Sequence, residues 1–462
     1  VISNVINILS VTELGISTAI VYHLYGALAR KDEAEIASLM NLYRKAYHVF
    51  AVLVFAAGMA VLPFIHLFMK NNSYSLSYIR VLYAMWLVRT VLSYLLTYRK
   101  SLLIADQKEY IASITGLILN VVSYLAIILL VTWEQNYLLA LGIGTVTEVV
   151  LNIWISWYVE QKYPFLRQRR KEKSTSSLTK RIVRDLKSLF ISRISEKMLY
   201  CTDNLIISGF IGVGTVGRYA NYCMITQAIS NILTILANTI QPTVGDYFTE
   251  KNRQRNYEIL RQLTFGFFCI ASVVSVGLFS LITPFVRDIW LGPSYELGWG
   301  ITVFCIVVLL VRIMGLPLSL VMGVTGLFEK EKNVGASSAL LNLIVSLALV
   351  KPYGMAGVLL GTLLSYLLQI LYRYIIYFRD FLEMPGEALR YAQDIGEYLA
   401  VIAGEVLLMQ KIVPLIYGAG GMLLFCVCFL LCIAIPLLLD LVIFGRGWRL
   451  QSIVTMVKGC LL

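Results

Sequence analysis

Long apolar runs recur along most of this chain, and they limit what it can fold into. A helix rises about 1.5 Å per residue, so about 20 apolar residues cross the ~30 Å hydrocarbon core of a bilayer. The composition agrees, because 58% of the residues are hydrophobic and only 14% are charged. A chain of 462 residues with so little polar sequence cannot cover the surface of a soluble globule. We therefore predict an all-α polytopic membrane protein.

Thirteen runs are long enough to be membrane spans. The predicted spans are residues 1–29, 44–69, 77–103, 109–133, 136–160, 186–212, 215–247, 258–287, 297–326, 333–350, 354–378, 391–413 and 419–445. The first run does not resemble a signal peptide, because it lacks a basic leader and continues past 25 residues.

Cysteine and histidine give no sign of a metal or cofactor site. Most of the eight cysteines lie inside apolar runs, and none forms a CxxC pair. The three histidines, His23, His48 and His66, fall on separate segments. We expect neither a metal centre nor a cofactor.

Basic residues indicate the orientation of the spans. Lys and Arg concentrate in alternate connections, most densely at 162–187. Cytoplasmic loops carry this excess, so we expect the C-terminus inside and Val1 outside. The net charge of +12 is then a topology signal, and nucleic-acid binding is not expected. The run RQRRKEK at 167–173 is predicted to be a linker that rests against anionic lipid.

Short sequence matches about 220 residues apart indicate an internal duplication. The matched pairs are Pro63-Phe64 with Pro284-Phe285, Leu87-Val88-Arg89 with Leu310-Val311-Arg312, Leu119-Asn120 with Leu341-Asn342, and Gly144-Thr145 with Gly361-Thr362. Shifted back by this offset, the span 186–212 lands before Val1. We infer that one N-terminal span is missing from this sequence and that the intact protein has fourteen.

The duplication also divides the chain. We predict an N-terminal lobe at 1–160, a basic cytoplasmic linker at 161–185, a C-terminal lobe at 186–380, and a terminal helix pair with a cytoplasmic tail at 381–462. The lobes have six helices each in the intact protein.

The span 186–212 carries charged side chains where hydrocarbon is expected. Its polar residues share one helical face: Arg193, Glu196, Tyr200 and Asp203, with Lys197 and Asn204 on the flank. A charge facing lipid costs from about 3 kcal/mol upward, so this face should look into protein or a water-filled cavity. It is a candidate transport pathway. The alternative is an ion-pair ladder of Arg193, Glu196 and Lys197 that only locks helices together.

Arg89 and Arg312 lie near the middle of corresponding spans in the two halves. A pseudo-twofold axis would place them on opposite walls of one cavity, near Arg193 and Lys197. Arginine presents a fork of donors suited to phosphate oxygens, so the four basic residues are candidates for binding a diphosphate. The alternative is that each arginine pairs with an intramembrane acid and holds a helix in place.

Carboxylates inside spans are candidate proton or sodium sites. Asp203 and Glu13 are the first choices, with Glu196 beside them on the charged face, and Tyr200 and Asn204 are expected to line the cavity. Glu148 is interpreted as structural, and Glu405 has no assigned role.

Two stretches carry a family resemblance. TELGISTAIVYHLYGALARKDEAEI at 12–36, with NLYRKAYHV after it, and TDNLIISGFIGVGTVGRYANY at 202–222 resemble the Wzx-type polysaccharide flippases. These belong to the multidrug/oligosaccharidyl-lipid/polysaccharide (MOP) superfamily, with MATE exporters and the lipid II flippase MurJ. The matching positions are Glu13, Asp203 and Asn204.

The resemblance implies two six-helix lobes around a V-shaped central cavity, plus a terminal helix pair. It implies that the protein moves an undecaprenyl-diphosphate-linked oligosaccharide to the outer leaflet of the bacterial cytoplasmic membrane. The resemblance also implies that transport proceeds by alternating access and is coupled to H⁺ or Na⁺. It further implies association with other polysaccharide-assembly membrane proteins.

Three rival functions stay open at this point. A MurJ-type lipid II flippase shares nearly every physical feature. A MATE-type exporter of organic cations would need a cavity dominated by acids, whereas basic and acidic residues roughly balance here. A membrane glycosyltransferase would need large outward catalytic loops, but the predicted outer connections are short and no DxD motif occurs. We expect a protein that is not an enzyme.

Overall fold

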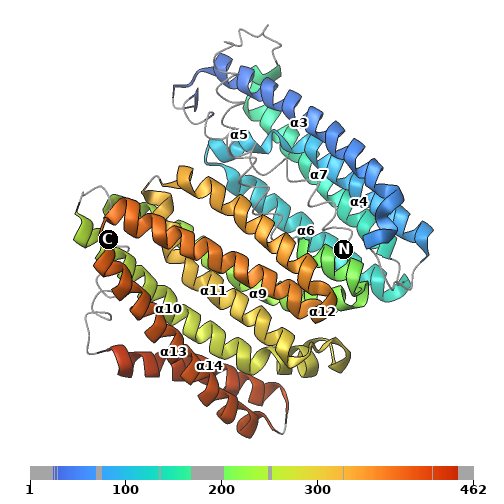
Figure 1. Cartoon of the computed structure of the whole chain (residues 1–462). Coiled ribbons are helices and arrows are strands. Elements are labelled where there is room, and N and C mark those ends of the chain that lie inside the picture. The colour runs from blue at the N-terminus through green and yellow to red at the C-terminus, as the bar shows by residue number, and fades with distance from the viewer. Residues whose placement is uncertain are drawn as a thin grey trace. The chain divides into compact units, whose positions relative to one another are not determined.

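The computed structural model describes residues 30–68, 75–134, 137–167, 202–247, 252–325, 327–418 and 420–445, together with residues 24, 27 and 28. Within these residues the chain is helical and contains no strand, which confirms the all-α prediction. Contacts divide it into two compact units, Val1–Gly212 and Val213–Leu462. Figure 1 shows the helices of both units, and each unit is described by itself.

The first unit is an antiparallel set of long helices with short connections. Its elements are α3 (Glu33–Val61), the 3₁₀ turn η2 (Leu62–Phe68), α4 (Leu76–Thr97), α5 (Lys100–Ala105), α6 (Glu109–Glu134), α7 (Tyr137–Lys162) and η3 (Pro164–Arg167). Small polar side chains begin two of the helices. Asp32 accepts a hydrogen bond from the Glu35 amide at the start of α3, and Ser75 accepts one from the Tyr78 amide at the start of α4.

The core of the first unit lies where α4 packs between α3 and α7, while α6 packs on α7 (Figure 1). Tyr83 of α4 is fully buried, and its hydroxyl donates to the Gly58 carbonyl of α3 at 2.9 Å. A Cβ on Gly58 would lie 2.3 Å from a Leu87 methyl carbon. Glycine at this position therefore lets α3 and α4 approach closely.

The second unit begins with a long helix, α9, continues in an order that resembles that of the first unit, and ends with two further helices. It consists of α9 (Val213–Tyr247), α10 (Arg253–Pro284), the π turn η4 (Phe285–Trp290), η5 (Pro293–Tyr295), α11 (Trp299–Val324), α12 (Phe328–Ile376), η6 (Tyr377–Leu382), α13 (Pro385–Tyr417) and α14 (Met422–Phe444). α12 is a hairpin of two helices, because Gly354 inside it has a φ of 57° that breaks the helix.

α10 is central to the second unit, since it packs against α11, α13 and α14 (Figure 1). Arg261 of α10 binds Asp394 of α13 through two hydrogen bonds, of 2.6 and 3.0 Å. Further along the same interface, Phe268, Tyr398 and Phe444 form an aromatic cluster, with ring centroids 4.5 to 5.7 Å apart. The terminal helix pair is therefore joined to α10 by both charge and ring packing.

Ten helices of the described residues are long and apolar enough to cross a membrane, so this is a multi-pass membrane protein. α12 covers two of the predicted spans. Most of the predicted spans 1–29 and 186–212 lies outside the described residues, so the totals of thirteen and fourteen stay predictions.

Parts of the two units follow a similar order of elements, and the duplication itself stays a prediction. α3 and α10 both end in an irregular turn at the matched Pro-Phe pairs, Pro63-Phe64 and Pro284-Phe285. α4, the short α5 and the pair α6 and α7 follow the first turn, whereas α11 and the α12 hairpin follow the second. The lobe boundaries stay predictions. Among the described residues, 202–212 lie with the first unit, where Leu205 packs against its core.

Candidate functional site

A seam of polar side chains runs along the interface of α4 and α7 in the first unit. Polar residues recur every four or eight positions on α7 and so share a face that meets α4 and α5. The pairs along it are Arg89 with Glu148 (Nε to Oε2, 2.6 Å), Thr97 with Asn152 (3.2 Å), and Arg99 with Glu160 (2.5 Å). In each pair the two side chains provide each other with a polar partner within an otherwise apolar helix interface.

Arg89 and Glu148 both lie near the middle of their helices. The Arg89 side chain is 28% exposed, and its guanidinium lies over the Trp86 ring at 5.1 Å from the centroid. Space for the head group comes from Gly144, where a Cβ would approach Nη1 to 3.3 Å. Sequence and packing thus create a recess on α7 that holds a guanidinium.

The contact with Glu148 uses only Nε of Arg89. Neither terminal nitrogen forms a hydrogen bond to the described part of the chain, and the head group is partly open. An arginine held by one edge can present its other edge to an anion, because the guanidinium has five N–H donors in a fixed plane. This geometry combines a structural ion pair with the capacity to bind a phosphate oxygen.

The other predicted site residues fall into two groups. Arg312 is half-buried in α11, the helix that corresponds to α4 in the second unit. Asp203 is buried at 5% exposure, and Asn204 is half-buried, with Oδ1 lacking a hydrogen-bond partner among the described residues. Five lie outside the described residues: Glu13, Arg193, Glu196, Lys197 and Tyr200.

Sequence reasoning missed which acid meets Arg89. It weighed pairing with an intramembrane acid in general terms and interpreted Glu148 as structural, without connecting the two. A signal was present, since Arg89 and Glu148 are each the lone charge in the middle of a predicted span. Two such isolated charges of opposite sign favour a pair. No cluster of three or more metal-ligating side chains occurs in the described ranges.

Comparison with solved structures shows where this fold occurs. A lipid II flippase MurJ in an inward closed conformation has a TM-score of 0.65 and 16% sequence identity, over 95% of this chain and 90% of that one. An inward-facing multidrug resistance MATE transporter of the MOP superfamily has a TM-score of 0.60 and 15% sequence identity, over 80% of this chain and 87% of that one. A mutant of the Vibrio cholerae MATE transporter VcmN has a TM-score of 0.52 and 12% sequence identity, over 81% of this chain and 86% of that one.

At these identities the likeness concerns the fold alone. A comparison with curated proteins gives no match. The sequence profile of the family described as "Polysaccharide biosynthesis protein" matches residues 3–248, just over half of the chain, and this range includes the α4–α7 seam. The chain therefore belongs to the polysaccharide biosynthesis protein family, and it has the fold of the MurJ and MATE membrane transporters.

Proposed function

We propose that this protein moves an undecaprenyl-diphosphate-linked oligosaccharide from the cytoplasmic to the outer leaflet by alternating access. The family match and the transporter fold support a flippase. The proposal places the protein in a bacterial cytoplasmic membrane, with its C-terminus inside. The substrate's diphosphate binds Arg89, Arg312, Arg193 and Lys197, and a cation, H⁺ or Na⁺, binds Asp203, Glu13 or Glu196 to bias the inward and outward states.

The observation that carries this proposal is the arrangement of Arg89. A purely structural ion pair needs no open guanidinium edge, yet the terminal nitrogens of Arg89 form no hydrogen bond within the described residues. A diphosphate is the part shared by all substrates of this lipid-linked class, and arginine recognises it through paired N–H donors. The Trp86 ring on one side and Glu148 on the other keep the head group in place for such contact.

Two rival substrates fit the same fold. MurJ is named as a lipid II flippase, and lipid II carries the same diphosphate as the proposed substrate. MATE proteins are named as multidrug transporters, and an organic cation would be repelled by an open arginine. The Arg89 geometry therefore favours a lipid diphosphate over a cationic drug, and the sugar portion must be distinguished by experiment.

The test uses the protein reconstituted in proteoliposomes with a fluorescent lipid-linked substrate and a membrane-impermeant quencher. We expect transbilayer movement of an undecaprenyl-diphosphate oligosaccharide, and a large loss of movement in the Arg89→Gln, Arg312→Gln double variant. Parallel vesicles contain fluorescent lipid II or an organic cation. Faster movement of lipid II would assign the MurJ-type function, and export of the cation alone would contradict a flippase.

A matched control separates binding from folding. Arg99 pairs with Glu160 on the same interface, and the exposures of the two side chains, 25% and 30%, resemble those of Arg89 and Glu148. Arg99 also donates to the Tyr98 hydroxyl and the Ser156 carbonyl, so Arg99→Gln should disturb packing at least as much as Arg89→Gln does. If both variants lose transport equally, the arginine at position 89 is structural and the diphosphate site lies elsewhere.

A further inference from the structure

Two carboxylates that the transport proposal does not use meet inside the second unit. Glu405 lies on α13 and Asp440 on α14, the terminal helix pair, and both helices pack against α10. Glu405 is 2% exposed and Asp440 is 4% exposed. They lie close enough for their charges to interact, with Ser272 of α10 next to both. Neither the formation of these helices nor their packing on α10 requires an acidic side chain at these positions.

The hydrogen bonds at this pair are incomplete. The Ser272 hydroxyl donates to Oε2 of Glu405 at 2.6 Å, and this uses its single proton. Oε1 of Glu405 and both carboxyl oxygens of Asp440 have no hydrogen-bond partner among the described residues. Buried polar oxygens are nearly always satisfied, and two neighbouring carboxylates repel each other when both are ionised. This pair therefore requires a positive charge or a proton.

The side chains around the pair do not supply that charge. The titratable groups facing Asp440 are Glu405 from α13 and the Cys269 thiol from α10. Asp440 is the lone ionisable carboxyl of α14. The nearest basic residue along α10 in the described structure, Arg261, lies about 16 Å away along the helix and is engaged by Asp394.

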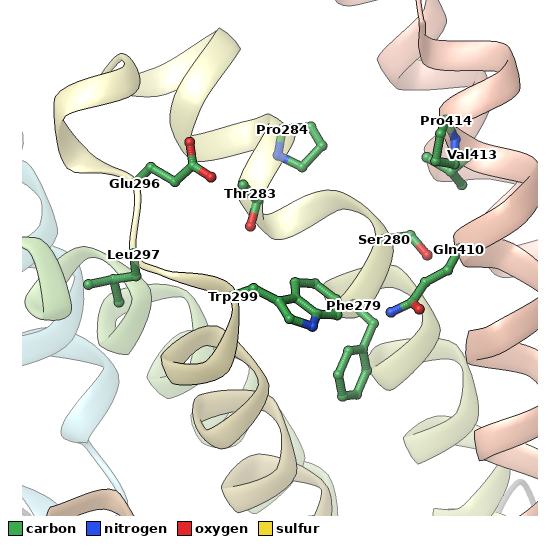
Figure 2. Close-up of a pocket in the computed structure, with 10 residues that line it drawn as sticks. All are labelled: Phe279, Ser280, Thr283, Pro284, Glu296, Leu297, Trp299, Gln410, Val413 and Pro414. Atoms are coloured by element: carbon green, nitrogen blue, oxygen red, sulfur yellow. The ribbon is translucent and has the colours of Figure 1, made fainter. Parts of the chain in front are cut away.

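Buried serines occur on α10 between this pair and a pocket. Ser272, Ser275 and Ser280 of α10 are buried, and the Ser275 hydroxyl has no hydrogen-bond partner in the described chain. Ser280 lines a pocket of about 330 Å³ together with Gln410 of α13, one and a half turns beyond Glu405. Figure 2 shows Ser280 and Gln410 on one side of this pocket and Thr283 and Glu296 on the other.

The pocket has the charge that a cation route needs. Glu296 contributes a carboxylate, Ser280, Thr283 and Gln410 contribute polar oxygens, and no basic residue is among its lining side chains. The aromatic cluster of Phe268, Tyr398 and Phe444 packs across the same three helices. The buried serines of α10 are thus the polar side chains of this helix between the pocket and the carboxylates.

We propose that Glu405, Asp440 and Ser272 form a binding site for one monovalent cation, H⁺ or Na⁺, entered from the Glu296 pocket. Two carboxylates and one hydroxyl supply fewer oxygen ligands than the six to eight that Ca²⁺ takes, which favours a monovalent ion. None of these three residues is among those that the proposed function assigns to transport. The site does not depend on the identity of the transported lipid.

The first test is the thermal unfolding of the whole protein in detergent, over a range of pH in sodium or choline chloride at equal ionic strength. We expect the midpoint to rise by several degrees with Na⁺, or with acidification in choline, and the salt that acts identifies the ion. The Glu405→Gln, Asp440→Asn double variant should lose this response. Glu397→Gln, which removes an exposed carboxylate from the same helix, should keep it.

A second measurement uses the unaltered protein, so that a misfolded variant does not decide the outcome. Infrared difference spectra should show a protonated carboxyl band that disappears on raising the pH or on adding Na⁺, and radioactive sodium should bind only in the second case. An equal response of parent and double variant would overturn the site. So would a parent with neither a protonated band nor sodium binding, or one stabilised more strongly by Ca²⁺ than by either ion.

Discussion

Nε of Arg89 lies 2.6 Å from Oε2 of Glu148, and this contact joins α4 to α7 while leaving the far edge of the guanidinium open. The pair therefore has two separable properties. Glu148 contributes to packing only, whereas Arg89 contributes to packing and offers donors to an anion. Variants of the two residues should differ in transport although they break the same contact.

The first prediction is this asymmetry. Arg89→Gln should lower the flipping rate of the diphosphate lipid about tenfold to a hundredfold, the loss expected when hydrogen bonds to a charged group, worth about 1.5–3 kcal/mol, are removed. Glu148→Gln should keep most of the rate, because its arginine remains. Both should lower stability by a similar amount, about 1 kcal/mol for a half-exposed pair. Equal rates in the two variants would show that the pair serves packing alone.

Gly144 offers a way to move Arg89 without removing it. A Cβ at this position would lie 3.3 Å from Nη1, so Gly144→Ala should shift the guanidinium by a few tenths of an ångström and slow flipping. Alanine is the better helix former, by about 1 kcal/mol, so the melting temperature should not fall. Gly142→Ala on the same helix is the control, since its Cβ would meet Met85 at an ordinary 4.0 Å. Unchanged flipping in Gly144→Ala would contradict the recess.

The sequence predicts the helices of this protein better than it predicts their partners. Apolar runs set the helices, and side chains such as Asp32 mark where one begins, because both signals are local. The Arg89–Glu148 contact is not local. The contact depends on the packing of α4 against α7, and the two residues are 59 positions apart in the chain. The residue pattern within one helix does not indicate which other helix it packs against.

Glu405 and Asp440 show the same limit more strongly. Each is an acid within an apolar stretch of its helix, and the sequence analysis gave Glu405 no role. Only the packing of α13 and α14 on α10 brings them to one serine. The matched Asn120 and Asn342 also differ in place, because Asn120 is exposed whereas Asn342 is fully buried and donates to Thr362 at 2.9 Å.

The α12 hairpin should be intolerant of a side chain at Gly361. A Cβ there would lie 2.4 Å from Oγ of Ser346, so Gly361→Ala should destabilise the protein by about 1–3 kcal/mol, as overpacking does. Thermal unfolding in detergent measures this, with Gly404→Ala as control, because that position has open space. Adding Ser346→Gly should restore part of the loss. A Gly361→Ala protein as stable as its parent would show that the two arms of α12 are farther apart.

Asp106 should make stability depend on pH at the acid end. It lies outside the spanning helices, in the turn before α6, and accepts hydrogen bonds from Lys108 and from the Tyr163 hydroxyl. Burial opposes its ionisation, but these two donors outweigh it and lower the pKa of Asp106 below the ordinary 3.8. A carboxyl whose pKa falls on folding stabilises the native state above the unfolded value, and this contribution is lost as the pH falls through the folded value.

The expected result is a loss of about 1 kcal/mol of stability on acidification below about pH 4, which Asp106→Asn removes because an amide does not titrate. The unfolding midpoints of parent and variant are measured across this pH range. Their difference isolates Asp106, because the other acids titrate equally in both proteins. Glu109→Gln, a change to an exposed carboxylate at the start of α6, should leave the acid slope in place. If parent and Asp106→Asn lose stability in parallel, the turn is not held by the ionised carboxylate, and Tyr163 and Lys108 contribute to it by packing alone.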